Sequence, residues 1–183
     1  MKKKKTSIPG LFVIEENSVF EDDRGLFFES WSEKKMNSLK LKTTFKQDNI
    51  SISNKNVLRG LHIQISPKSQ LKLVQVLKGS VIDVIIDLRK KSPTFGKYEK
   101  ILLDSNERKM IWIPEGCAHG FLSLQNKTIF SYKCNKSYNP NYEITLNWND
   151  PDLNINWKIN KPIISKKDKK GISLKDFLKL KQQ

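Results

Sequence analysis

The chain has 183 residues and carries 34 Lys and Arg against 19 Asp and Glu, a formal net charge of +15 at pH 7. We find no internal repeat, so this length predicts a single domain over residues 1–183, large enough to bury roughly two thirds of its unfolded surface. No apolar run is long enough to span a bilayer, and Lys2–Lys5 leads into Thr6 rather than into an apolar signal core. We therefore expect a cytoplasmic protein with no membrane partner.

The lysine excess is typical of proteins that bind phosphate backbones. Many of the lysines, however, lie near the two ends of the chain, and the sequence shows no zinc-ligand spacing, RNA-binding aromatic signature or basic helix–turn–helix. We interpret them as solvated charge, with basic flexible ends at about residues 1–7 and 171–183, and expect no nucleic-acid partner. Cys117 and Cys134 lie in apolar strand-like segments, which favours reduced, buried thiols.

Short alternating or β-rich segments recur along the chain, separated by Gly, Pro, Asn and Asp. The predicted strands are residues 11–14, 26–31, 46–53, 57–64, 70–77, 81–88, 98–103, 109–113, 120–124 and 129–135. A tight hairpin is predicted at residues 78–80, and helix only at residues 32–39 and after a capping box at Ser173. So many strands with so little helix predict an all-β sandwich or jelly-roll barrel around a central cavity.

Cationic or titratable side chains lie within or at the ends of several predicted apolar strands, namely Arg59 and His62 in VLRGLHIQ, Lys72 in QLKLV and His119 in CAHGF. Each of them alone is more often a structural residue. Together they indicate a cavity for a polyanion, because a buried cation without a partner is costly. In a regular strand Arg59 and His62 point to opposite faces, so both line one pocket only if Gly60 introduces a bulge.

One face of the predicted strand 81–88 is apolar, and the other carries Asp83 and Asp87. We expect this second face to supply carboxylates to a polar cavity.

Eight segments match, in order, the motifs of one known family. They are DRG…FE from Asp23, QDNIS from Gln47, VLRGLH from Val57, QLKLV from Gln70, SPTFG from Ser92, WIP…AHGF from Trp112, YK from Tyr132 and WNDP from Trp148. Over roughly residues 8–170 the chain thus resembles the dTDP-4-dehydrorhamnose 3,5-epimerase family. The resemblance implies an all-β, cupin-type jelly-roll barrel with short peripheral helices, no metal, no organic cofactor and usually a homodimer.

The resemblance also implies roles for individual residues. His62 matches the general base, Lys72 the cation beside the ketone oxygen, and Tyr132 the acid on the opposite face of the sugar ring. Asp168 matches the carboxylate paired with His62, but Asp152 and Asp176 are also available in this part of the chain. The positions that contact the nucleotide sugar or order the pocket are Arg24, Glu29, Gln47, Asn49, Arg59, His119, Glu143 and Lys167. In this family the segment from Arg24 to Glu29 tends to serve the site of the neighbouring subunit.

The implied reaction inverts C3 and C5 of dTDP-4-dehydro-6-deoxy-D-glucose, a nucleotide-sugar substrate, to give dTDP-4-dehydro-L-rhamnose for polysaccharide biosynthesis. Both hydrogens are α to the ketone, so a base of near-neutral pKa can remove them if the enolate is stabilised. The alternatives are an epimerase for another nucleotide-linked 4-keto sugar or for C3 only, and a noncatalytic sugar-binding jelly roll. A metal-dependent cupin is disfavoured, because the chain has only two histidines.

Overall fold

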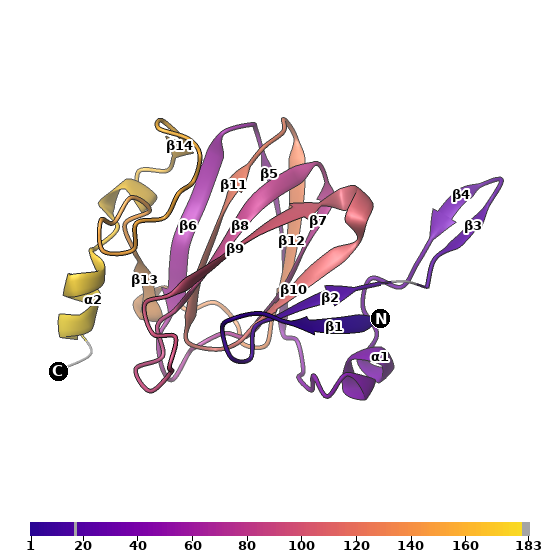
Figure 1. Cartoon of the computed structure of the whole chain (residues 1–183), viewed down its shortest axis with the longest axis horizontal. Coiled ribbons are helices and arrows are strands. Elements are labelled where there is room, and N and C mark those ends of the chain that lie inside the picture. Colours follow the sequence, from indigo (N-terminus) through magenta and orange to yellow (C-terminus); the bar gives the residue numbers. More distant parts are fainter. Residues whose placement is uncertain (17, 181–183) are drawn as a thin grey trace.

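Two β-sheets face each other in the computed structural model, which describes residues 1–16 and 18–180 (Figure 1). The first sheet runs in the order β1 (Lys2–Lys5), β2 (Phe12–Glu15), β10 (Lys109–Ile113), β7 (Lys72–Lys78), β12 (Thr128–Cys134) and β5 (Gln47–Ser53). The second runs in the order β13 (Glu143–Thr145), β6 (Val57–Gln64), β11 (Cys117–Ser123), β8 (Ser80–Asp87) and β9 (Tyr98–Asp104), with β14 (Ile163–Ile164) parallel to β6.

The remaining elements are short and peripheral. A hairpin of β3 (Phe20–Asp22) and β4 (Gly25–Phe27), called the arm below, projects away from both sheets (Figure 1). The helices are α1 (Glu33–Ser38) and α2 (Leu174–Leu180), and single 3₁₀ turns lie at Ser105–Glu107, Pro140–Tyr142 and Asp168–Lys170. The predicted all-β architecture with short peripheral helices is therefore confirmed. None of the described helices is both long and apolar enough to cross a membrane.

Three apolar clusters hold these layers together. The first lies between the two sheets and includes Val74, Ile85 and Phe130. The second covers the outer face of the second sheet, where Trp157 and Phe177 of the C-terminal region pack. The third joins α1 to the outer face of the first sheet. Each fully buried large apolar side chain contributes about 1.5–3 kcal/mol.

Most predicted strands lie where the sequence places them. The strands predicted at residues 57–64 and 109–113 have the predicted bounds. For the strands predicted to begin at residues 11, 46, 70, 81, 98 and 129, the observed start, end or both differ from the prediction by one or two residues. The prediction over residues 26–31 is wrong beyond Phe27, because β4 pairs only with the three residues of β3. The strand predicted at 120–124 starts at Cys117, where pairing with Asp87 begins.

The ends that the sequence suggests are flexible contain regular structure in part. Lys2–Lys5 form the edge strand β1, which pairs along its whole length with β2. Near the other end, α2 starts after Ser173, whose Oγ accepts from Asp176 N at 3.0 Å, and Phe177 is fully buried. The predicted flexible residues 181–183 lie outside the described residues. Cys117 and Cys134 are free and buried, as predicted.

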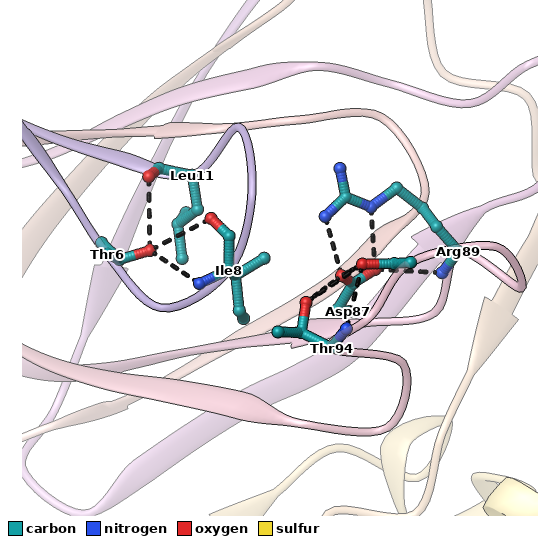
Figure 2. A network of polar contacts seen from close by, with 7 residues as sticks. Thr6, Ile8, Leu11, Asp87, Arg89 and Thr94 are labelled. Atoms are coloured by element: carbon teal, nitrogen blue, oxygen red, sulfur yellow. Dashed lines mark hydrogen bonds and ion pairs between the residues drawn. The ribbon is translucent and has the colours of Figure 1, made fainter.

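Asp87 anchors the loop between β8 and β9 (Figure 2). Its carboxylate is fully buried and accepts from Arg89 Nε at 2.8 Å, Ser92 Oγ at 2.5 Å and Thr94 Oγ1 at 2.7 Å. Burial opposes ionisation, but these hydrogen bonds outweigh it and hold the pKa of Asp87 below its usual range. Asp87 therefore fixes a loop of the fold, and it does not supply a carboxylate to the cavity as we expected from the sequence.

Replacing this anchor should destabilise the fold. Asp87→Ala leaves the half-buried donors of Arg89, Ser92 and Thr94 without their acceptor, and we expect it to lower the free energy of unfolding by about 3 kcal/mol. Urea denaturation at pH 7 measures the loss. The control is Asp152→Ala, because its carboxylate is 37% exposed and lies 3.5 Å from Lys175; we expect a change within about 0.5 kcal/mol. A similarly small loss for Asp87→Ala would contradict the anchoring role.

Candidate active site

A cavity of ≈ 460 Å³ lies between the two sheets. It is lined by Ser51, Val57, Leu58, Arg59, His62, Lys72, His119, Gly120, Phe121, Phe130, Tyr132, Ile163, Ile164, Ser165, Lys167 and Asp168. A smaller hollow of ≈ 80 Å³ shares His62, Lys72 and Tyr132 with it and adds Gln47, Asn49 and Glu143. Ten of the twelve predicted site residues therefore gather around one connected region, called the pocket below.

Strand β6 reaches this arrangement through a bulge at Gly60. Leu58 and Leu61 both pack in the apolar cluster on the outer face of the second sheet, whereas Arg59 and His62 both line the pocket. In the pairing with β11, His62 lies opposite His119 and Arg59 opposite Phe121, so β6 has one residue more than β11 over this interval. The bulge that the sequence analysis required is confirmed.

Only glycine fits at the centre of this bulge. Gly60 has φ +119°, and a Cβ there would lie 2.6 Å from Gly120 Cα and 2.9 Å from His119 O. Gly120 is also sterically constrained, since its Cβ would lie 2.7 Å from Arg59 O. The two strands therefore approach each other closely where the pocket is formed.

His62 is paired with Asp168, which the chain supplies from the 3₁₀ turn at Asp168–Lys170. His62 Nε2 lies 2.7 Å from Asp168 Oδ1, and Gly60 N donates to Asp168 Oδ2 at 3.2 Å. Burial opposes ionisation of Asp168, but the hydrogen bond and charge of His62 together with the Gly60 N–H lower its pKa. The other two candidate partners lie elsewhere: Asp152 faces Lys175 and Asp176 contacts Ser173.

His119 has a carboxylate of its own, which the sequence analysis did not assign to it. His119 Nε2 lies 2.8 Å from Asp83 Oδ1, and the side chains are 7% and 0% exposed. The signal in the sequence was the inward position of Asp83 on its strand, but no local pattern connects it to a residue 36 positions later.

Lys72 and Tyr132 lie on neighbouring strands of the first sheet, and Lys72 Nζ is 5.9 Å from the centroid of the Tyr132 ring. Burial lowers the pKa of Lys72, and the carboxylates of Glu143 and Asp83 partly offset this effect. Burial also raises the pKa of Tyr132, which keeps its hydroxyl protonated near neutral pH.

Glu143 organises the smaller hollow. Its carboxylate accepts from Tyr138 Oη at 2.7 Å and from Lys167 Nζ. Burial opposes ionisation of Glu143, but these two donors and His62 lower its pKa. Gln47 joins the group, because Tyr138 N donates to Gln47 Oε1 at 2.7 Å. Tyr138 is absent from the predicted site, since it lies in an irregular segment without an apolar pattern.

Arg24 and Glu29 do not reach the pocket of their own chain. Arg24 lies in the arm, is 90% exposed at its side chain and pairs with Asp22 at 2.6 Å, while Glu29 pairs with Lys35 at 2.7 Å. The arm pairs with neither sheet, so no strand pairing brings Arg24 toward the pocket. Among the described residues, no group of three or more His, Cys, Asp or Glu side chains is placed to hold a metal ion.

Two facing sheets around a polar pocket define a protein of the cupin type, and similarity to known proteins gives its family. The model of the family described as dTDP-4-dehydrorhamnose 3,5-epimerase matches residues 5–176. A Shigella flexneri protein named dTDP-4-dehydrorhamnose 3,5-epimerase is 44% identical over 168 residues, 91% of this chain and 92% of that protein. The chain therefore belongs to the dTDP-4-dehydrorhamnose 3,5-epimerase family and is an isomerase.

Solved structures agree with this assignment. The dTDP-4-dehydrorhamnose 3,5-epimerase of Elizabethkingia anophelis NUHP1 matches with a TM-score of 0.90 and 45% identity, over 96% of this chain and 97% of that one. The dTDP-6-deoxy-D-glucose-3,5-epimerase of Legionella pneumophila, solved in complex with dTDP-4-keto-L-rhamnose, matches with a TM-score of 0.90 and 40% identity, over 95% and 93% of the chains. The resemblance seen in the sequence motifs is thus confirmed.

The close approach of β6 and β11 leads to a prediction about Gly60. Gly60→Ala places a methyl group against the β11 backbone and strains φ, and we expect it to cost at least about 3 kcal/mol of unfolding free energy. The control is Gly96→Ala, because Gly96 has φ +74° but nothing within 4 Å of its Cβ position. Strain at φ alone should cost about 1–2 kcal/mol. Equal losses in urea denaturation would show that the close approach does not matter.

Proposed function

We propose that this chain inverts C3 and C5 of dTDP-4-dehydro-6-deoxy-D-glucose to give dTDP-4-dehydro-L-rhamnose, with His62 as base and Tyr132 as acid. The observation that carries the proposal is the His62–Asp168 pair, 2.7 Å apart, in a pocket that also holds Lys72 and Tyr132. Family membership and the dTDP-sugar in the L. pneumophila structure support the choice of substrate.

His62 takes up the ring protons in this proposal. An ionised Asp168 only accepts hydrogen bonds, so it fixes the His62 proton on Nε2 and leaves Nδ1 with the lone pair. When Nδ1 removes a proton from C3 or C5, the carboxylate stabilises the imidazolium that forms. The lowered pKa of Asp168 supports this assignment, because it keeps the carboxylate charged.

Lys72 stabilises the enolate. Loss of a proton next to the ketone moves negative charge onto the ketone oxygen, and an ammonium in a pocket shielded from water stabilises that charge strongly. Glu143 and Asp83 help Lys72 to keep its proton despite burial, which lowers its pKa. The protonated ammonium can then donate to the developing oxyanion.

Tyr132 returns the proton from the other side of the ring. His62 belongs to β6 of the second sheet, whereas Tyr132 belongs to β12 of the first. A sugar held between the sheets therefore meets a base on one face and a phenol on the other, which is what inversion requires. The raised pKa of Tyr132 keeps the phenol protonated and able to act as an acid.

The diphosphate and nucleoside are assigned to the remaining polar residues. Arg59 is held by Ser53, whose Oγ accepts from Arg59 Nε at 3.0 Å, and by Ile52, whose carbonyl oxygen accepts from Nη2 at 3.3 Å. The N–H groups that remain suit a phosphate oxygen. His119, Lys167 and Glu143 line or border the same pocket, and Gln47 Nε2 donates to Asn49 Oδ1 at 2.8 Å. We assign these residues to substrate binding.

The chain is further proposed to act as a homodimer in the cytoplasm, as the family resemblance implies. The arm exposes Phe20 and Phe27 at 68% and 67%, together with Arg24. A second copy that covers these aromatic side chains gains buried apolar area and receives Arg24 and Glu29 near its own pocket.

Proton exchange tests the function. The protein is incubated with dTDP-4-dehydro-6-deoxy-D-glucose in deuterated water, and the sugar ring is followed by NMR. We expect label at C3 and C5 and formation of the L-rhamno product. Label at C3 alone indicates a C3-only epimerase, and binding without exchange indicates a sugar-binding protein; either result contradicts the proposal.

His62→Ala should abolish exchange at both carbons while the fold is retained. Removing a general base typically costs 10²–10⁴-fold, so we expect kcat to fall by about 10³-fold with little change in substrate affinity. His119→Ala serves as the comparison and should cost less, because a binding contact contributes only part of the transition-state stabilisation. Substantial turnover in well-folded His62→Ala would refute the assignment.

Tyr132→Phe should separate exchange from inversion. The substitution keeps the ring but removes the hydroxyl, so His62 still abstracts protons while reprotonation on the opposite face fails. In deuterated water we expect the variant to retain label uptake at C3 and to form at least about 100-fold less C5-inverted product. Near-native inversion at both carbons would show that another group is the acid.

A further inference from the structure

The pocket contains two imidazole–carboxylate pairs side by side. His62 and His119 lie directly opposite each other on β6 and β11, and each contacts its own buried carboxylate, Asp168 or Asp83. The proposed mechanism uses the first pair as a base but gives the contact between the second carboxylate and His119 no role. Asp83 is fully buried, so its ionised form needs compensating contacts.

We propose that Asp83 is a positioning residue, which holds His119 in the tautomer with the proton on Nε2 and thereby presents Nδ1 to the sugar as a hydrogen-bond acceptor. This inference rests on the proposed function, because it concerns how the same pocket binds its substrate.

The His119 ring is held by two contacts. Nε2 lies 2.8 Å from Asp83 Oδ1, and the ring stacks on Phe130 with centroids 5.9 Å apart and planes inclined by 28°. The hydrogen bond and the aromatic contact therefore fix both the position and the orientation of the imidazole. With Nε2 engaged, Nδ1 is the remaining polar atom of the ring.

The carboxylate of Asp83 determines which nitrogen of His119 carries the proton. An ionised carboxylate has no proton to donate, so Nε2 must be the donor in the pair. In a neutral ring this leaves a lone pair on Nδ1, which suits a sugar hydroxyl. An amide in place of Asp83 could donate as well as accept, and the tautomer would no longer be determined.

One carboxylate oxygen of Asp83 is not engaged by His119. Asp83 Oδ2 is buried and has no hydrogen-bond partner within the described part of the chain. The negative charge of Asp83 acts on Lys72, another side chain of the pocket, and favours its protonated form. This charge effect is the smallest of the effects on the pKa of Lys72, behind those of burial, Cys134 and Glu143, so the main contact of Asp83 is the one with His119.

The same strand offers a matched control. Asp87 lies four residues after Asp83 on the same face of β8 and is also fully buried, but its partners are Arg89, Ser92 and Thr94 outside the pocket (Figure 2). Asp87→Asn therefore perturbs a buried carboxylate of β8 without altering His119.

The tautomer is read directly by ¹⁵N NMR of the imidazole rings, which requires no substrate. The chain has only two histidines, so the signals that disappear in His119→Ala identify that ring. We expect the Nε2–H tautomer for His119 in the wild type and in Asp87→Asn, and a mixture containing Nδ1–H in Asp83→Asn. Nδ1–H in the wild type, or an unchanged tautomer in Asp83→Asn, would overturn the proposal.

Kinetics show whether the tautomer matters for the reaction. We expect Asp83→Asn to raise KM about tenfold, the size of one net hydrogen bond, with kcat within about threefold. In a His119→Ala background the same substitution should change KM by less than about twofold, because Asp83 acts through the ring. If the two substitutions instead raise KM independently, so that their effects multiply in the double variant, Asp83 does not act through His119 and the proposal is refuted.

If Asp83→Asn does not fold, Asp83→Ser provides the second variant, since its smaller side chain leaves room for water. A wild-type protein without turnover would refute the proposed function, whereas the tautomer measurement would still decide the Asp83–His119 pairing.

Discussion

The pocket depends on the close approach of β6 and β11 at Gly60 and Gly120. At this point β6 has one additional residue, which interrupts the regular alternation so that Arg59 and His62 share the inner face. The Gly60 N–H donates to Asp168 Oδ2. A single backbone irregularity therefore places the imidazole and helps to hold the carboxylate that orients it.

The two-sheet architecture determines which groups oppose each other. The second sheet contributes the two histidines and Asp83, whereas the first contributes Lys72 and Tyr132. Side chains of opposite sheets meet only across the interior, so a ligand between them has different chemistry on its two faces. The apolar cluster between the sheets fills the rest of the interior and confines these polar groups to the pocket.

Much of the fold could be predicted from the sequence, because strand alternation is a local property. Residues 57–64 and 109–113 were predicted with their observed bounds for this reason. Lys2–Lys5 were not predicted as a strand, since their side chains resemble a solvated tail and only pairing with β2 orders them. The extension of β11 to Cys117 likewise depends on its pairing with β8.

The candidate site was less predictable than the strands, because it depends on contacts between residues that are far apart in the sequence. The motifs around Arg59, His62, Lys72 and His119 mark the pocket, but the resemblance rather than any local pattern singled out Asp168 as the partner of His62. The Asp83–His119 pair and Tyr138 were missed because each depends on contacts that the fold creates between separate elements. Arg24 and Glu29 show the reverse case, since their motifs are clear but their own chain leaves them outside the pocket.

The position of Asp168 in the chain has a consequence for synthesis. His62 and the carboxylate that orients it are 106 residues apart, and Asp168 belongs to the C-terminal region that covers the second sheet. At a translation rate of about 5–20 residues per second, His62 leaves the ribosome roughly 5–20 s before Asp168. The strands up to β13 can pair in this interval while the imidazole has no partner, so the pocket is completed only when the segment that carries Asp168 docks.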